Sequence, residues 1–346
     1  MLGKFLCSLL RKVNEKPSKV YGKEETLANH QLHRKNEILA TSFAAEIPRT
    51  ITEGGLGISE KLNLNPIRKF KKSSIILEGE RSAGFVNITF GKSSCTINPV
   101  GATIVDYSVD GVPVLGIYKE REILNSEHVN GGIPIIFPFG TRPGEDISSG
   151  QLWIWDEKVL ENSNFTETSF ILCDNESTRS IWPHSFKLTY TVMLYENVLK
   201  TRIYVENMSL QTFDFTILFH NYLNLYFTQF AALEGVKGAL FNEFGLDYEE
   251  VKDCRPSVFV QREIDRIYWD IKRPLKLNYD LGYVNITLQG FPDISLWNPA
   301  IQDHHYQDKK EFKKMICVIP GNFTKPSVLE PAGKWQGEQI LNPVFQ

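Results

Sequence analysis

Short apolar or alternating segments recur from about residue 73 almost to the end of the chain. Successive residues of a strand face opposite sides of a sheet, so this pattern predicts strands. Asp110-Gly111 and Glu196-Asn197 stand between such segments as hairpin turns. The predicted strands are 74–77, 85–90, 94–97, 102–109, 112–116, 170–173, 186–195, 199–206, 213–225, 267–270, 275–279, 284–289, 295–297 and 315–319. With no long amphipathic helix between them, they predict a large, mostly antiparallel all-β sandwich.

Residues 213–225, FDFTILFHNYLNL, form the most regular of these segments. Phe213, Phe215 and Phe219 share one face of the predicted strand, and His220 falls on the other. A histidine at this place is either a hydrogen-bonded core residue or a proton donor that lines a cleft.

Residues 1–70 lack this strand pattern. Residues 1–13 place their apolar side chains on one helical face, and no acidic residue precedes Glu15. This is typical of an organelle-targeting helix and equally of a basic surface extension. We therefore predict an irregular extension over 1–70 and a β-sandwich domain over 71–346. The expected location is cytoplasmic, with targeting to an organelle through residues 1–30 as the alternative.

Composition excludes several classes of protein. The net charge of −3 gives no reason to expect a nucleic-acid partner, and no apolar run is long enough to span a membrane. The five cysteines are scattered, without a CxxC pair, which argues against a disulfide framework or a zinc site and favours a reducing compartment. P-loop, GxGxxG, GxSxG and HExxH motifs are absent. We expect a monomer without a cofactor.

Candidate chemistry is spread over several segments. Gly131-Gly132 allows close approach of the backbone to a ligand or simply a tight turn, and Arg142 is a candidate anion contact. The Asp265 carboxylate could bind a sugar hydroxyl or belong to an Asp265–Arg266 surface turn. Trp297 suits either an apolar platform for a sugar or a core plug. The segment SIWPHSF, which holds His184, is expected to be structural.

The order of these segments resembles the aldose 1-epimerase (galactose mutarotase-like) superfamily, and within it the glucose-6-phosphate 1-epimerases. The motifs are GGIPIIFPFG, TRSIWPHSFKLTYTVML, LFHNYLNL, EIDRIY, LWNP, MICVIPG and VLEPAGKWQG. The resemblance implies a large antiparallel β-supersandwich over about 73–340. It also implies ring opening of a hexose or hexose phosphate by an acid and a base on opposite sides of the sugar. His220 would be the acid, Asp265 would bind a hydroxyl, and the cleft would be lined by Gly131, Gly132, Trp297 and Asn298.

The chain departs from the family pattern at the base and at the phosphate. Ile319 occupies the position of the family's catalytic glutamate, and an isoleucine cannot accept a proton. Asn130 replaces an arginine before GGIP, and residues 149–153 lack the usual histidine and arginine, so two phosphate contacts are missing. Two hypotheses follow. One is a hexose (6-phosphate) 1-epimerase with a substitute base, for which Glu330 and Asp303 are candidates. The other is a catalytically impaired relative that serves as a carbohydrate-binding or scaffold protein.

Overall fold

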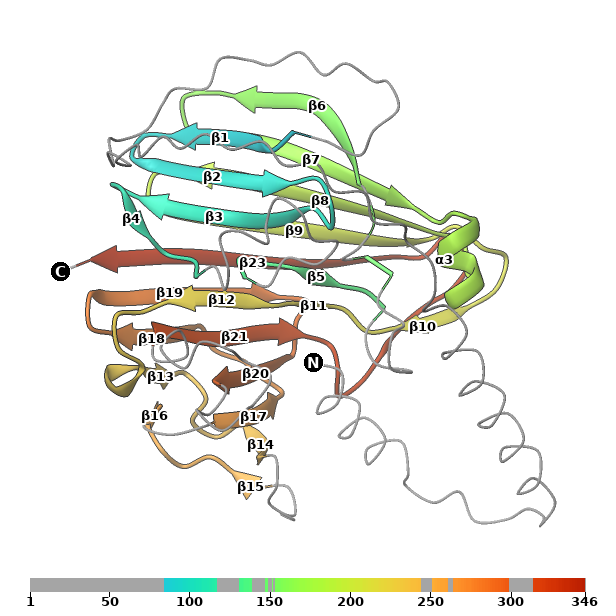
Figure 1. Ribbon diagram of the computed structural model, residues 1–346. Coiled ribbons are helices and arrows are strands. Elements are labelled where there is room, and N and C mark those ends of the chain that lie inside the picture. Colours follow the sequence, from blue (N-terminus) through green and yellow to red (C-terminus); the bar gives the residue numbers. More distant parts are fainter. Residues whose placement is uncertain are drawn as a thin grey trace, which may run out of the picture. The chain divides into compact units, whose positions relative to one another are not determined.

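Three antiparallel sheets and a short strand pair make up the part of the chain that the structure describes (Figure 1). The computed structural model describes residues 84–116, 131–138, 147–148, 151, 153–243, 251–260, 264–298 and 314–345. The predicted extension and the predicted strand 74–77 lie outside these ranges, so the domain boundary near residue 70 stays a prediction. Within them, no helix has the length and apolarity to cross a lipid bilayer.

The first sheet is a meander close to the predicted one. Its four described strands are β1 (Val86–Phe90), β2 (Ser93–Asn98), β3 (Thr103–Val109) and β4 (Val112–Pro113). Asp110 and Gly111, with φ of 53° and 78°, form the predicted turn between β3 and β4. Positive φ at both central positions is the type I′ signature that hairpins favour, and it explains the Asp-Gly pair.

A nine-stranded sheet forms the largest layer among the described residues. Its order is β16 (Ser257–Phe259), β13 (Ala232–Glu234), β18 (Leu275–Tyr279), β19 (Gly282–Gln289), β23 (Lys334–Phe345), β9 (Val198–Asn207), β8 (Phe186–Tyr195), β7 (Thr166–Cys173) and β6 (Ile154–Glu161). The Glu196-Asn197 hairpin turn is confirmed, since Asn197 has φ of 59° and Tyr195 pairs with Val198. A six-residue helix, α3 (Glu176–Ile181), joins β7 to β8; Asn175 caps it by accepting from the Thr178 amide.

An eight-stranded sheet carries the candidate site. Its order is β15 (Val251–Lys252), β14 (Leu240–Glu243), β17 (Ile264–Trp269), β20 (Asp293–Asn298), β21 (Met315–Gly321), β11 (Leu218–Phe219) and β5 (Ile135–Ile136), and β12 (Asn221–Asn224) also pairs with β21. Two further strands, β10 (Phe213–Phe215) and β22 (Ser327–Leu329), pair separately. A 3-10 helix, η1 (Thr228–Phe230), follows β12.

Apolar side chains from all three sheets form one buried cluster, the main core. The four-stranded sheet packs through β1 and β2 against β7 and β8. In the eight-stranded sheet, Phe219 contacts Tyr190 and Phe291, which lie on or beside the nine-stranded sheet. The prediction of a mostly antiparallel all-β sandwich is confirmed.

One predicted strand is wrong, and one long strand was not predicted. Residues 213–225 are not one strand, because β10 pairs with β22 whereas β11 and β12 pair with β21, with breaks at 216–217 and at His220. The longest described strand, β23, was not predicted; it begins at Lys334, directly after a turn at Pro331 and Ala332. The sequence pattern does not reveal this strand because its polar residues are paired with residues of other strands. Glu338 forms ion pairs with Lys200 and Arg202, and buried Gln339 pairs with Asn221.

Candidate functional site

His220 and Ile319 lie directly opposite each other on one face of the eight-stranded sheet. The pairs Leu218–Gly321 and Asn221–Val318 set the same register on either side of them. Directly opposed residues of antiparallel strands have Cβ atoms about 5 Å apart. The row continues through Ser295, the partner of Ile319, to Ile267. The predicted acid therefore faces an aliphatic side chain where the family resemblance predicts the base.

A second row of side chains runs beside the first. In it Asp265 pairs with Trp297, Trp297 with Cys317, and Cys317 with Tyr222. We call this side of the sheet the site face, and define it by the residues of the two rows: Ile267, Ser295, Ile319, His220, Asp265, Trp297, Cys317 and Tyr222. Its apolar members form a small cluster of their own, separate from the main core. Residues of the opposite parity, such as Val318 and Leu296, belong to the main core.

His220 is held by its backbone and by two aromatic rings. Its amide donates to the Pro134 carbonyl (2.9 Å), and its ring centroid lies 4.1 Å from that of Tyr222 and 5.9 Å from that of Trp297. Its Nε2 is buried and has no hydrogen-bond partner among the described residues. Burial lowers the pKa of His220 to about 3. The imidazole is therefore neutral near pH 7, and a buried polar nitrogen of this kind calls for a ligand or another specific role.

Ser295, on the other side of Ile319, also carries a buried polar side-chain atom. It is almost completely buried, and its Oγ also has no hydrogen-bond partner among the described residues. Two polar atoms without partners thus flank one isoleucine. The sequence did not single out Ser295, although its parity with Trp297 within one strand was the available signal.

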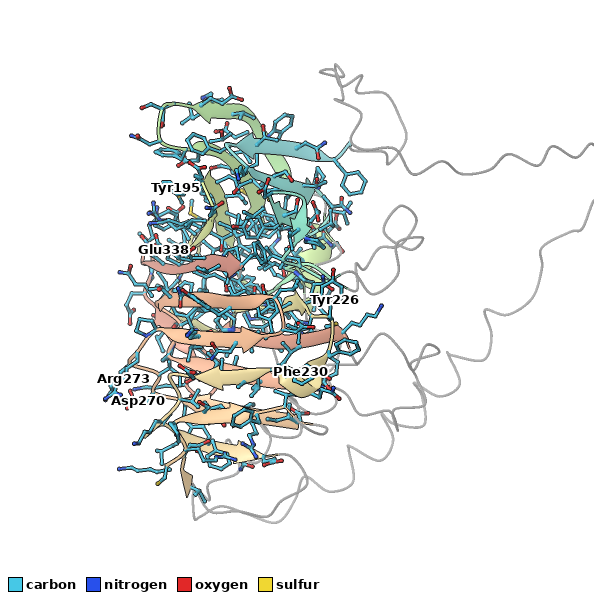
Figure 2. All side chains as sticks on the ribbon, turned by 90° about the vertical axis from the view of Figure 1, so that its left-hand side faces the viewer. Tyr195, Tyr226, Phe230, Asp270, Arg273 and Glu338 are labelled. Atoms are coloured by element: carbon cyan, nitrogen blue, oxygen red, sulfur yellow. The ribbon has the colours of Figure 1, made fainter. Side chains whose placement is uncertain are left out.

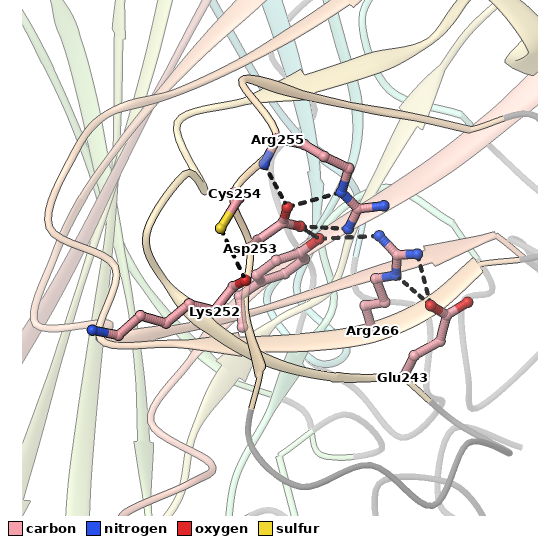
Figure 3. Close-up of polar contacts among 7 residues, drawn as sticks. Glu243, Lys252, Asp253, Cys254, Arg255 and Arg266 are labelled. Atoms are coloured by element: carbon pink, nitrogen blue, oxygen red, sulfur yellow. Dashed lines mark hydrogen bonds and ion pairs between the residues drawn. The ribbon is translucent and has the colours of Figure 1, made fainter.

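Asp265 and Arg266 point to opposite sides of β17. Arg266 faces the main core, where its Nε donates to Glu243 Oε2 (2.8 Å; Figure 3). Its guanidinium also lies over the Phe241 ring. The Tyr268 hydroxyl donates to Asp253 Oδ2 (2.9 Å), which also pairs with Arg255. The alternative of an Asp265–Arg266 surface turn is wrong, because both residues are in a strand. Alternation places Asp265 on the site face beside Trp297.

The glycine pair beside His220 is explained by packing against the neighbouring sheet. Gly132 has φ of 68°, and a Cβ there would lie 2.0 Å from the Ile104 carbonyl oxygen. Ile133 donates to that same oxygen, and the Gly132 carbonyl accepts from the Tyr222 amide (2.9 Å). Gly131 and Gly132 thus bring the backbone beside the site face and against β3.

The remaining candidates divide between those the structure describes and those it does not. Asn298 directs its amide to the Met315 carbonyl (2.5 Å), which ties β20 to β21 rather than reaching the site face. Glu330 accepts from the Thr212 hydroxyl (2.5 Å) after β22, which pairs with β10 outside the eight-stranded sheet; this favours a turn-stabilising carboxylate over a base. Asn130, Arg142 and Asp303 lie outside the described residues.

His184, just before β8, lies in a cluster of aromatic rings. His184 packs between the rings of Trp182 and Phe213, with Trp182 and Phe186 buried, as a structural role requires. Among the described residues, no cluster of three or more His, Cys, Asp or Glu side chains could hold a metal ion.

Comparison with known proteins identifies the family. The family model "Aldose 1-epimerase" matches residues 85–342, well over half of the chain. This chain belongs to the aldose 1-epimerase family.

The individual relatives share low sequence identity with this chain. A protein of Cenchrus ciliaris named "Putative glucose-6-phosphate 1-epimerase" is 26% identical over 237 residues, covering 62% of this chain and 70% of the relative. The fold is similar to the crystal structure of "a putative mutarotase (YeaD) from Salmonella typhimurium", with a TM-score of 0.67, 17% identity, and coverage of 76% of this chain and 90% of that one. It is also similar to galactose 1-epimerase from Lactobacillus acidophilus, with a TM-score of 0.60, 13% identity, and coverage of 77% and 96%. These structures share the galactose mutarotase-like fold with this chain.

Proposed function

We propose that this protein binds a hexose on the site face and has lost most of the family's ability to interconvert the α and β anomers. The observation that carries this proposal is the arrangement around Ile319. His220 Nε2 and Ser295 Oγ are buried on either side of it without partners among the described residues. Neutral donors and acceptors beside apolar groups suit sugar hydroxyls and the apolar face of a pyranose ring.

The chemistry of ring opening explains why activity should be weak. A base must remove the proton of the anomeric hydroxyl while an acid protonates the ring oxygen, and each proton transfer contributes roughly 10²–10⁴-fold in rate. Ile319 supplies no base. A carboxylate at this place would also favour the charged imidazolium of His220. Isoleucine offers no such charge, so burial lowers the pKa of His220 to about 3. One substitution therefore weakens both the base and the acid.

A second candidate is an active glucose-6-phosphate 1-epimerase, favoured by the name of the Cenchrus ciliaris relative. In that case the base is a group other than residue 319. Asp265 is the carboxylate on the site face, but it stands on β17, two strands away from β21. Strands are spaced about 4.8 Å apart, so Asp265 lies roughly 10 Å from the strand that carries Ile319. That distance suits a hydroxyl contact at another sugar position better than a base opposite His220.

Magnetisation-exchange NMR tests the two candidates. Purified protein is added to glucose, galactose and glucose 6-phosphate, and the α/β exchange rate is compared with buffer and with the His220→Ala variant. Saturable binding of the same sugars is followed by saturation-transfer NMR. We expect exchange near the buffer rate, together with saturable binding that His220→Ala weakens.

Other outcomes are equally informative. Strong acceleration of exchange by the wild-type protein, abolished in His220→Ala, would establish the second candidate and contradict the loss of activity. Absence of both exchange and binding for all three sugars would overturn the carbohydrate proposal and favour a scaffold role.

A further inference from the structure

Three exposed aromatic rings stand just beyond the site face on the same stretch of chain. Tyr226, Phe227 and Phe230 are 57%, 54% and 57% exposed, and we call them the aromatic patch. The Phe227 and Phe230 rings contact each other at 6.3 Å between centroids. Figure 2 shows Tyr226 and Phe230 on one side of the molecule, with Tyr195 and Glu338 of the nine-stranded sheet on the opposite side. Adjacent exposed aromatic side chains mark a candidate site for a ligand or a partner.

The patch is continuous with the site face through β12. This strand carries Tyr222 on the site face and ends at Asn224, and the Leu225 amide still donates to the Lys314 carbonyl (2.7 Å). Tyr226 follows four residues after Tyr222, so their Cα atoms are at most about 14 Å apart. A linear chain of several sugar units spans such a distance. The aromatic patch is therefore within reach of a longer ligand whose terminal hexose occupies the site face.

The chemistry of the segment favours a sugar chain over a membrane or a protein. Residues 226–230 read YFTQF, with a hydroxyl and an amide between the rings and no charged residue. The Tyr226 amide donates to an acidic neighbour, Asp280, at Oδ1 (3.4 Å). Membrane-surface segments instead combine apolar residues with lysine and arginine. Aromatic rings combined with neutral hydrogen-bonding groups suit the alternating apolar and hydroxyl-bearing surfaces of a glycan.

We infer that the ligand is an oligosaccharide of hexose units, with its terminal sugar on the site face and the following units across the aromatic patch. This inference rests on the proposed function, because it takes the site face as the place of the terminal sugar. It also gives a reason why a member of an epimerase family can lack a base. A protein that holds the end of a glycan needs to bind the terminal sugar and has no need to open its ring.

Calorimetric titration of the full chain tests the inference with glucose, galactose and mannose and with linear hexaoses of each sugar. We expect at least one hexaose to bind the wild-type protein about ten-fold or more tightly than its monosaccharide, a difference of one decade in Kd. Tyr226→Ala/Phe227→Ala/Phe230→Ala should remove this gain and leave monosaccharide binding unchanged. Phe227→Tyr/Phe230→Tyr should keep the gain, because the rings remain.

Met208→Ser/Leu210→Ser is the matched control. It removes two apolar side chains that are also exposed, at 59% and 95%, in the turn after β9; we expect no change in affinity. If monosaccharides bind and no hexaose binds more tightly, or if the triple alanine variant keeps the gain, the inference is overturned while the proposed function stands. Failure of every sugar to bind would overturn both.

Discussion

The two faces of the eight-stranded sheet differ in whether their buried polar groups have hydrogen-bond partners. On the face toward the main core, Arg266 pairs with Glu243, and Asn221 exchanges two hydrogen bonds with Gln339, at 2.7 and 3.0 Å. On the site face, His220 and Ser295 are just as deeply buried, yet His220 Nε2 and Ser295 Oγ have no partner within the described residues. The same strands therefore carry satisfied polar groups on one side and unsatisfied ones on the other.

We interpret this difference as one between polar groups that hold the fold together and polar groups that bind a ligand. Leaving a polar group buried without a partner costs about 1–3 kcal/mol, so buried polar groups in folded proteins are usually paired. Four further buried atoms outside this sheet, in Tyr107, His184, Tyr190 and Thr201, also have no partner among the described residues. The core face follows that rule and ties the strands together. On the site face, we infer that a ligand supplies the hydrogen-bond partners that His220 and Ser295 lack among the described residues. Each variant below tests one side of this comparison.

The largest effect is expected on the core face. Arg266→Met removes one partner of a buried ion pair and leaves Glu243 to carry a buried charge, which typically costs about 3–5 kcal/mol. Urea unfolding followed by circular dichroism measures the loss. Lys272→Ala is the control, since it breaks the exposed Lys272–Asp270 pair and should cost less than about 1 kcal/mol. Equal effects of the two variants would show that the core-face network does not stabilise the fold.

The next effect concerns the pH dependence of stability. The pKa of His220 is about 3 in the folded protein and near 6.5 when unfolded, so between these values the unfolded chain binds a proton that the folded chain does not. The contribution of His220 to stability is thus present above pH 6.5 and is lost as the pH falls toward 3.

Compared with His220→Asn, the wild-type protein should lose up to about 3 kcal/mol more unfolding free energy between pH 7 and pH 4. Urea unfolding curves at pH 7, 5.5 and 4 measure the difference. Parallel pH profiles for the two proteins would mean that His220 keeps an ordinary pKa and is not buried as a neutral group.

An intermediate effect is expected for the amide pair. Asn221→Ala removes hydrogen bonds to Gln339 and to the Val318 carbonyl in a fully buried position, leaving Gln339 without its partner. We expect a loss of about 2 kcal/mol in thermal or urea unfolding. A loss below about 0.5 kcal/mol would indicate that the core face tolerates unpaired groups as the site face does.

The smallest effect on stability, and the sharpest contrast, is expected for Ser295→Ala. Because the Ser295 hydroxyl has no partner among the described residues, its removal should change the unfolding free energy by less than about 0.5 kcal/mol or raise it. Sugar affinity should nevertheless fall, by about ten-fold for the loss of one hydrogen bond to a ligand. A clear destabilisation, or unchanged sugar binding, would contradict the role assigned to Ser295.

The sequence predicts the strands well where apolar residues alternate and poorly where they do not. Strands β8 and β18 begin and end where predicted, because their alternation is regular and turns bound them. Strand β23 was missed because its stability comes from partners on β9, β12 and β19, which the local pattern does not contain. The break at His220 was missed for the same reason, since it reflects which strand pairs with β21.

The candidate site shows the same division. Alternation alone places His220 on the face opposite the phenylalanines, and the family resemblance predicts that Ile319 stands at the position of the base. That Ile319 stands between His220 and Ser295 depends on the register of β20, β21 and β12, which no single segment encodes. The loss of a charged neighbour for His220 could be predicted from the sequence, but the buried hydroxyl on the other side could not.

The most direct test places a carboxylate at residue 319. Ile319→Glu is compared with Ile319→Gln, which has the same size and no base, by α/β exchange NMR of glucose and glucose 6-phosphate, with folding of both variants checked by circular dichroism. The account predicts that wild type and Ile319→Gln stay near the buffer rate. Ile319→Glu should accelerate exchange by about 10²-fold or more, and the pKa of His220 should rise as a carboxylate comes to face it. Exchange that is already fast in the wild-type protein, or a folded, sugar-binding Ile319→Glu variant that stays at the buffer rate, would contradict it.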